Sequence, residues 1–209
     1  MAIATLSNFT VPLASDQSAT SQGMLMPKLK YRFRVSFENF GVSTPTTELT
    51  KQVISAGRPK ATFDEQVIHV YNSQIKYAGK PKWGDLSIKL RDDVTGAVSK
   101  LVGEQNQKQF DFFEQSSAAS GMDYKFTTRI EILDGGNGAN TPNILETWVC
   151  YGCYVKETTW EGLDYKESGP AEITLSIGMD NALQSPTGAG VGAAIPRTTN
   201  TGATGSGSR

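Results

Sequence analysis

The sequence predicts a mainly β protein, an antiparallel sheet with one α-helix packed across its opening. Two observations predict this fold class. Segments in which apolar and polar side chains alternate recur between Leu29 and Met179, which is the pattern of strands with one buried face. One stretch, from about Val94 to Gln115, has apolar residues three and four positions apart instead, which is typical of a helix. A single helix in a chain rich in strands is expected to cover a sheet.

The first predicted strand, Leu29 to Phe37, has the most regular alternation. A slip of one residue would turn its whole apolar face outward, so the register is firmly set. The opposite face is basic and could touch a polyanion, although a solvated strand face is the commoner explanation. The apolar residues are Leu29, Tyr31, Phe33, Val35 and Phe37, and the basic residues are Lys30, Arg32 and Arg34.

Three further segments precede the helix. Thr46 to Ala56 is predicted as a strand that ends at Gly57-Arg58-Pro59. Gln66 to Tyr71 and Gln74 to Ala78 are predicted as a hairpin around Asn72-Ser73, closing at Gly79-Lys80-Pro81. Trp83 to Arg91 is the next strand, with Leu86, Ile88 and Leu90 on one face.

The helix over about 94–115 has recognisable ends. Asp92 or Asp93 can cap its start, and the run from Ser116 to Gly121 stops it. Tyr124 to Leu133 is predicted as a strand, and Asp134 to Asn140 as a turn.

Two strands joined by Trp160 to Pro170 close the folded region. The second, Ala171 to Met179, alternates regularly, whereas the strand that begins at Thr147 is apolar on both faces. We expect such a strand to need cover on both sides, from its own core and from the helix or a neighbouring subunit. Its faces carry Trp148, Cys150 and Tyr154 on one side, and Val149, Tyr151, Cys153 and Val155 on the other.

Length and composition predict one folded domain between two flexible ends. The 209 residues suffice for one domain with a sizeable core, or two small ones. Residues 1–27 form a polar arm and residues 185–209 a tail rich in Gly, Thr and Ser. Neither can bury enough apolar surface to offset the entropy of ordering, so both are expected to be flexible in the free protein. The predicted domain covers residues 28–184.

Charge and hydropathy exclude several classes of function. With 20 basic and 21 acidic residues, the chain lacks the basic excess that tight nucleic-acid binding requires. No apolar run reaches the roughly 18 residues of a membrane helix. The first residues lack the basic start and apolar centre of a secretion signal, so we expect folding in the cytosol.

No constellation of residues predicts an enzyme, and we expect no catalytic, cofactor-binding or metal site. Cys150 and Cys153 lie about 10 Å apart in a regular strand, beyond the roughly 7 Å that a disulfide spans, so a bridge would require a bend at Gly152. We expect both to be buried structural thiols. His69 lacks recognisable catalytic partners, so a structural or surface role is expected. Asp134 to Asn140 lacks the final acid of a calcium loop, and no phosphate loop is present.

The order of these motifs resembles the tail tube proteins, or inner tube proteins, of contractile-tailed bacteriophages. The resemblance covers roughly residues 28–184, and only the ordered set of short motifs carries it. The motifs are Tyr31-Arg32-Phe33-Arg34-Val35, Ala56-Gly57-Arg58-Pro59, Ala78-Gly79-Lys80, Trp83-Gly84-Asp85-Leu86-Ser87-Ile88, Arg91-Asp92-Asp93, Phe110 and Phe113, Trp148, Gly152, Leu163-Asp164-Tyr165, and the strand Ala171 to Met179 before Asp180.

The resemblance implies a β-sandwich or barrel with one flanking helix, forming hexameric rings that stack into a hollow tube inside a contractile sheath. Such a tube penetrates the host envelope and conducts genomic DNA. The implied partners are further copies of the chain, the tail sheath, tape measure, baseplate and tail terminator proteins, and double-stranded DNA in transit, without a small-molecule substrate or cofactor. The implied location is the virion tail, assembled in the bacterial cytoplasm.

Within this family, the connection from Gly57 to Pro81 is predicted to reach a neighbouring subunit or ring. The predicted interface residues are Arg58, Tyr71, Tyr77, Lys80 and Trp83. Alternatives are a tube-fold relative, such as a baseplate tube initiator, a secretion-system ring protein or a non-contractile phage tube protein, and, from another class, a carbohydrate-binding β-sandwich that uses Trp83 or Trp160.

Overall fold

The computed structural model describes residues 27–43, 45–135, 142–186 and 190–192. Contacts divide the chain into two units, Met1–Arg32 and Phe33–Arg209. In the first unit, the Arg32 N–H donates to the Leu29 carbonyl at 3.2 Å, and the Arg32 guanidinium carbon lies 5.4 Å from the centroid of the Tyr31 ring. Every helix and strand of the described residues belongs to the second unit.

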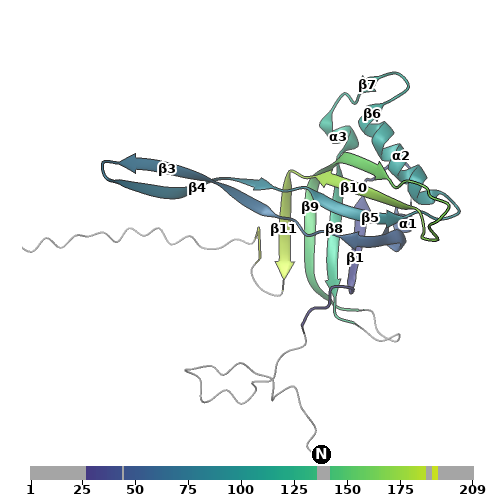
Figure 1. The fold of residues 1–209 in the computed structure, drawn as a ribbon, viewed down its shortest axis with the longest axis horizontal. Helices are drawn as coiled ribbons and strands as arrows, with labels where there is room; N and C mark the ends of the chain where they lie inside the picture. The colour runs from purple at the N-terminus through teal and green to yellow at the C-terminus, as the bar shows by residue number, and fades with distance from the viewer. Residues whose placement is uncertain (1–26, 44, 136–141, 187–189, 193–209) are drawn as a thin grey trace, which may run out of the picture. The chain divides into compact units, whose positions relative to one another are not determined.

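The second unit is mainly β, as predicted (Figure 1). Its strands are β1 (Phe33–Glu38), β2 (Val53–Ala56), β3 (Ala61–Val70), β4 (Ser73–Trp83), β5 (Leu86–Arg91), β6 (Phe110–Asp111), β7 (Ser116–Ser117), β8 (Phe126–Leu133), β9 (Ile144–Trp160), β10 (Glu172–Gly178) and β11 (Asn181–Pro186). Its helices are α1 (Thr47–Gln52), α2 (Ala97–Gln109) and α3 (Gly121–Tyr124).

The long strand β9 belongs to two parts of one seven-stranded antiparallel sheet. Its first half pairs with β8 and β11, and β8 pairs with β1, which gives the order β1-β8-β9-β11. Its second half pairs with β10, followed by β5 and β2. We call these parts the β8 half-sheet and the β10 half-sheet.

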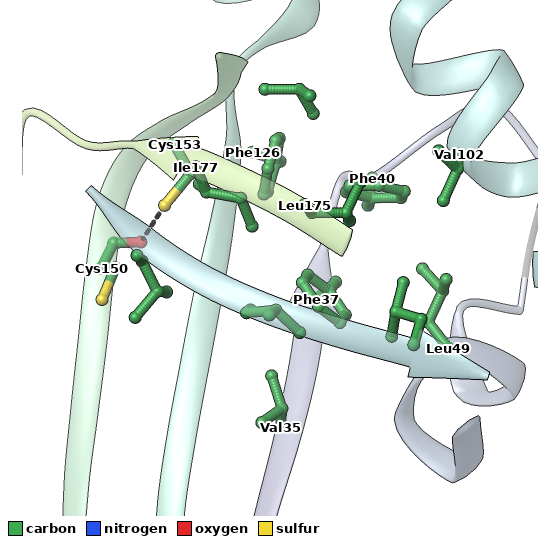
Figure 2. Packing of buried hydrophobic residues seen from close by; sticks show 14 of the residues in the cluster. Val35, Phe37, Phe40, Leu49, Val102, Phe126, Cys150, Cys153, Leu175 and Ile177 are labelled. Carbon is green, nitrogen blue, oxygen red and sulfur yellow. Dashed lines mark hydrogen bonds between the residues drawn. The ribbon is translucent and has the colours of Figure 1, made fainter. Parts of the chain in front are cut away.

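The hydrophobic core lies between the two half-sheets and α2. Figure 2 shows side chains of both half-sheets and of α2 meeting there. Because burial of each large aliphatic or aromatic side chain is worth roughly 1.5–3 kcal/mol, this layer holds the half-sheets face to face. The cluster includes Val35, Phe37, Ile130 and Cys150 from the β8 half-sheet, Leu86, Ile88, Leu90, Ile173, Leu175 and Ile177 from the β10 half-sheet, and Val98, Leu101 and Val102 from α2.

The predicted alternation is confirmed in β5 and β10 and in the second half of the first strand. Val35 and Phe37 are buried while Arg34 and Glu38 are exposed. The strand begins later than predicted, at Phe33, because the chain makes a turn just before it. Leu29 and Tyr31 therefore precede the strand, and Tyr31 is exposed.

The strand predicted over Thr46 to Ala56 is wrong in its first half. Residues Thr47–Gln52 form α1, and only Val53–Ala56 form a strand. A single residue of α1, Leu49, is fully buried, so a short helix is enough to place this side chain in the core. The hydroxyl of Thr46 donates to the Phe37 carbonyl and fixes the start of the turn.

The main helix is shorter than the predicted 94–115. It begins after Gly96, whose φ is +64°, and it ends at Gln109 because Phe110 is extended. Phe110–Asp111 and Ser116–Ser117 pair as a two-stranded ribbon instead. The short helix α3, which the sequence analysis missed, begins with a capping box between Ser120 and Asp123 and takes Tyr124 out of the next strand.

A bulge in β9 accounts for the strand that is apolar on both faces. Phe126 pairs with Cys153 and Thr128 with Cys150, so β9 has one residue more than β8 in this interval. Gly152, at φ +63°, supplies the left-handed backbone of the bulge. Both cysteines consequently face the core, fully buried. The predicted division of these side chains, with Cys150 on one face and Cys153 and Val155 on the other, is therefore wrong.

The predicted hairpin exists and is longer than predicted. β3 and β4 pair from Ala61 and Trp83 to Val70 and Ser73, with Tyr71 and Asn72 in the turn. Gly79-Lys80-Pro81 does not close the hairpin, because β4 continues through these residues to Trp83. Gly84 and Asp85 separate β4 from β5, which divides the single strand predicted over Trp83 to Arg91.

Strand β11 follows β10 without having been predicted. It pairs with β9 along six residues up to Pro186, two residues beyond the predicted end of the domain at 184. Most of the predicted arm 1–27, most of the tail 185–209 and all but the first two residues of the predicted turn at Asp134 to Asn140 lie outside the described residues.

Candidate assembly surfaces

The β3–β4 hairpin extends beyond the two half-sheets (Figure 1). Almost every residue of both strands is exposed, including large apolar side chains. A two-stranded ribbon without further cover is only marginally stable in water. The exposed apolar residues of the hairpin are Phe63, Val67, Ile68, Val70, Tyr71, Ile75 and Tyr77.

The outer half of the hairpin has two different faces. Strand register places Ile68 opposite Ile75, and Val70 and Tyr77 lie two positions from them on the same face. The other face is mainly polar: His69 lies opposite Gln74, and Lys76 pairs with Glu65 at 2.9 Å. We call Ile68, Val70, Ile75 and Tyr77 the apolar tip face. The sequence contained a signal for it, because apolar and polar side chains alternate in Ile68-His69-Val70 and again in Ile75-Lys76-Tyr77.

The turn of the hairpin presents an aromatic ring to solvent. Tyr71 is fully exposed, and its φ of +40° lies in a region that residues other than glycine seldom occupy. Glycine, asparagine or aspartate would suit this turn better. The tyrosine therefore strains the backbone, although its fully exposed side chain does not stabilise the folded unit. Such a residue is typical of a contact with a partner.

The structure brings some of the predicted interface residues together and not others. Tyr71 and Tyr77 lie on the outer half of the hairpin, whereas Lys80 is exposed at its bulge. Arg58 is exposed in the connection between β2 and β3. Trp83 lies at the base and packs against the hydrophobic core, which explains its partial burial within one chain.

The β8 half-sheet ends in two edge strands of equal length. Within the described residues, β1 pairs only with β8 and β11 only with β9. All neighbours are antiparallel, so the first and last of these four strands run in opposite directions. The outer edge of β11 carries one further contact, from the Gln184 N–H to the Val191 carbonyl at 2.7 Å.

The face of the β8 half-sheet that points away from the core is balanced in charge. In its paired segments this face carries two arginines and two glutamates, all on β1 and β8. Arg34 donates to Glu131 at 2.6 Å, and Arg129 donates to Glu38 at 3.2 Å. The remaining positions on this face are uncharged: Ser36, Thr127, Thr147, Val149, Tyr151, Asn181, Leu183 and Ser185.

The two cysteines lie in the hydrophobic core as free thiols. Cys150 and Cys153 are free and fully buried, and the Cys153 thiol donates to the Cys150 carbonyl at 3.3 Å (Figure 2). Burial raises the pKa of Cys150 to about 12, which disfavours the reactive thiolate. Among the described residues, no three His, Cys, Asp or Glu side chains gather as a metal site, and no helix is long and apolar enough to cross a membrane.

No protein-family model and no curated protein sequence matches the chain. Solved structures of contractile injection systems do match. A chain from the tube-terminating cap of the anti-feeding prophage superposes with a TM-score of 0.59 at 14% identity, covering 81% of this chain and 98% of that one. The chain has a tail-tube-like fold.

Two further structures support the tail-tube-like fold. A chain from the baseplate of the anti-feeding prophage matches with a TM-score of 0.56 at 13% identity, covering 78% of this chain and 98% of that one. A chain from the sheath–tube complex of the PVC extracellular contractile injection system matches at 0.53 and 17%, covering 77% and 92%. The antiparallel fold implied by the sequence resemblance is thereby confirmed.

Proposed function

We propose that this protein is the structural subunit of a tail tube: six copies form a ring, and rings stack into the hollow inner tube of a contractile phage tail. The observation that carries this proposal is the β8 half-sheet, an even-numbered antiparallel sheet with open edges of equal length. Joining β11 of one copy to β1 of the next continues the antiparallel order without interruption. A closed ring of such sheets leaves no edge strand unpaired.

Edge pairing also agrees with the register of the two strands. Val35 and Phe37 point to the core from β1, and Ala182 does so from β11. A junction that keeps these side chains on one side extends a single continuous core face around the ring. The bond from Gln184 to Val191 would be exchanged for a bond to the next copy.

The hairpin supplies the second contact of the proposal. Its apolar tip face is exposed in the single chain and would be covered by a neighbouring copy, in the same ring or the next one. The hairpin is expected to act together with the sheet edges, because stable interfaces bury a large total surface.

The proposed tube lies inside a sheath, ends at baseplate and terminator proteins, encloses a tape measure protein during assembly and conducts double-stranded DNA in the virion. Assembly in the bacterial cytoplasm is part of the same proposal. The likeness to sheath–tube and baseplate chains supports partners of this kind. A non-enzymatic role follows from the proposal.

A tube cap is the second candidate, because a tube-terminating cap gives a TM-score of 0.59 and nearly all of that chain is matched. The same fold is expected of a baseplate tube initiator, a secretion-system ring protein and a non-contractile tube protein. Assembly state separates them: a cap or initiator stops at one ring, whereas a tube subunit continues to stack.

Electron microscopy of the concentrated protein, with analytical ultracentrifugation, tests the proposal. A tube subunit gives six-membered rings and open-ended tubes, single rings alone favour a cap or initiator, and monomers at every concentration contradict all of these roles.

Ile68→Thr with Ile75→Thr should prevent stacking, whereas His69→Ala with Gln74→Ala on the opposite face should not. Arg58→Glu with Lys80→Glu should also block assembly while the circular dichroism spectrum remains unchanged. If this variant forms normal tubes, neither residue belongs to the interface.

A further inference from the structure

A ring closed through β1 and β11 can place only one face of the β8 half-sheet on its axis. The β10 half-sheet and α2 pack against the core face (Figure 2). Six copies of two such layers would have to fit inside the cylinder if the core face turned inward. The opposite face, with the two arginines and two glutamates, must therefore line the bore. This step rests on the proposed ring.

The charges on that face are arranged so that each cation has an anion on the neighbouring strand. Glu131 accepts both the Nε–H and an Nη2–H of Arg34, each at 2.6 Å. Arg129 reaches diagonally from β8 to Glu38 on β1. The half of the face on β9 and β11 carries no charge in its paired segments. The positive and negative charges of this face therefore cancel between neighbouring strands.

We propose that this cross-strand pairing keeps the bore from retaining a polyanion in transit. The arginine side chains are accessible, with 48% and 39% of their surface exposed for Arg34 and Arg129. Unpaired, they would displace counterions from phosphates and hold nucleic acid. A carboxylate within hydrogen-bonding distance cancels this attraction before a phosphate can approach. The remainder of the face carries no charge, with hydroxyl and amide groups beside the apolar side chains of Val149 and Leu183.

Removal of the two carboxylates tests the proposal directly. The variant Glu38→Gln with Glu131→Gln frees both arginines with little change in shape. Its matched control, Glu48→Gln with Asp85→Asn, removes two carboxylates of other ion pairs, with Lys51 and Lys156, outside this face. Binding of a short fluorescent DNA duplex is measured by anisotropy over a range of salt concentrations, with the soluble chain and with assembled material.

The wild-type chain and the control should bind weakly. The Glu38→Gln, Glu131→Gln variant should bind at least about tenfold more tightly at low salt, with a salt dependence steeper by about 2 per engaged copy. Adding Arg34→Gln and Arg129→Gln to this variant should abolish the gain. Because Glu131 is buried, Glu38→Gln alone is a second variant that retains the fold and should give part of the gain.

Equal binding by the variant, its control and the wild type would overturn the proposal, and so would tight binding by the wild type. Failure to form rings, seen by electron microscopy, would instead contradict the proposed function and place the charge-paired face on an ordinary surface. The two outcomes are separate because Arg34 and Arg129 are accessible in the single chain, where DNA binding is measured independently of assembly.

Discussion

The carboxylate of Glu104 on α2 binds Ser43 in the loop after β1 through two hydrogen bonds, from the backbone N–H at 2.8 Å and the hydroxyl at 2.6 Å. The Val42 N–H donates to the same carboxylate at 3.1 Å. Gln105, the next residue of the helix, is fully buried and accepts the Gly41 N–H. One turn of α2 thus fixes the end of β1, the strand that pairs with the next copy in the proposed ring.

Glu104 should make the fold sensitive to acid. The hydrogen bonds from the Ser43 side chain and backbone lower the pKa of Glu104 from 4.5 to about 2. Because the folded pKa is depressed, this stabilisation is complete above about pH 4.5 and is lost between there and pH 2. Glu104→Gln should cost about 1–3 kcal/mol at neutral pH and little at pH 2. Urea unfolding at both pH values measures the loss of stability, with Glu114→Gln at an exposed position as the control. An equal loss of stability at the two pH values would contradict the prediction.

The bulge at Gly152 should not tolerate a side chain. A Cβ there would lie 2.1 Å from Oδ2 of Asp180, which forms an ion pair with Lys125, and the φ of +63° disfavours other residues. We expect Gly152→Ala to lower the free energy of unfolding by at least about 2 kcal/mol. Gly103→Ala in α2, where no atom lies within 4 Å, should instead raise it by about 0.5–1 kcal/mol. Chemical denaturation of both variants decides; stabilisation by Gly152→Ala would refute the bulge.

Tyr71 should matter for assembly and not for the folded chain. Tyr71→Gly removes the strain of a positive φ, so the free energy of unfolding of the monomer should stay constant or rise by less than about 1 kcal/mol. The same change removes the fully exposed ring at the tip and should weaken stacking. Thermal unfolding and sedimentation are compared for the variant and the wild type. A stable variant that stacks normally would show that the ring is not an interface residue.

The two thiols should be unreactive in the folded protein. Burial raises the pKa values of both Cys150 and Cys153, so little thiolate forms at pH 8. We expect 5,5′-dithiobis-(2-nitrobenzoic acid) to label neither cysteine in buffer and both in urea. Rapid labelling in buffer, or formation of an intramolecular disulfide under mild oxidation without loss of the fold, would show that the two cysteines form a reactive pair.

Removal of the residues after Pro186 should favour ring formation. The chain then lacks the Val191 carbonyl that accepts the Gln184 N–H on the outer edge of β11. In the proposed ring this N–H becomes available to β1 of the next copy. The truncated chain should assemble at a lower protein concentration than the full chain, as measured by sedimentation velocity. Assembly only at a higher concentration would show that the segment supports the ring.

Alternation of side chains by itself determined the strands that contribute most to the core. In β5 and β10, every second residue is apolar, and a period of two permits only one assignment of the buried face. The hairpin of β3 and β4 was found from the same local signal, and the order of motifs pointed to the tail-tube-like fold. These features depend on neighbours in the sequence.

Only the tertiary structure decided the features that depend on partners far along the chain. The bulge at Gly152 exists because Phe126 and Thr128 of β8 pair around it, and it turned an apparent two-sided strand into one with a single core face. Likewise, α1 replaced half of a predicted strand because one buried residue, Leu49, packs on the core. The ion pairs of Arg34 and Arg129 join residues more than ninety positions apart, so no local pattern could reveal a face whose charges cancel.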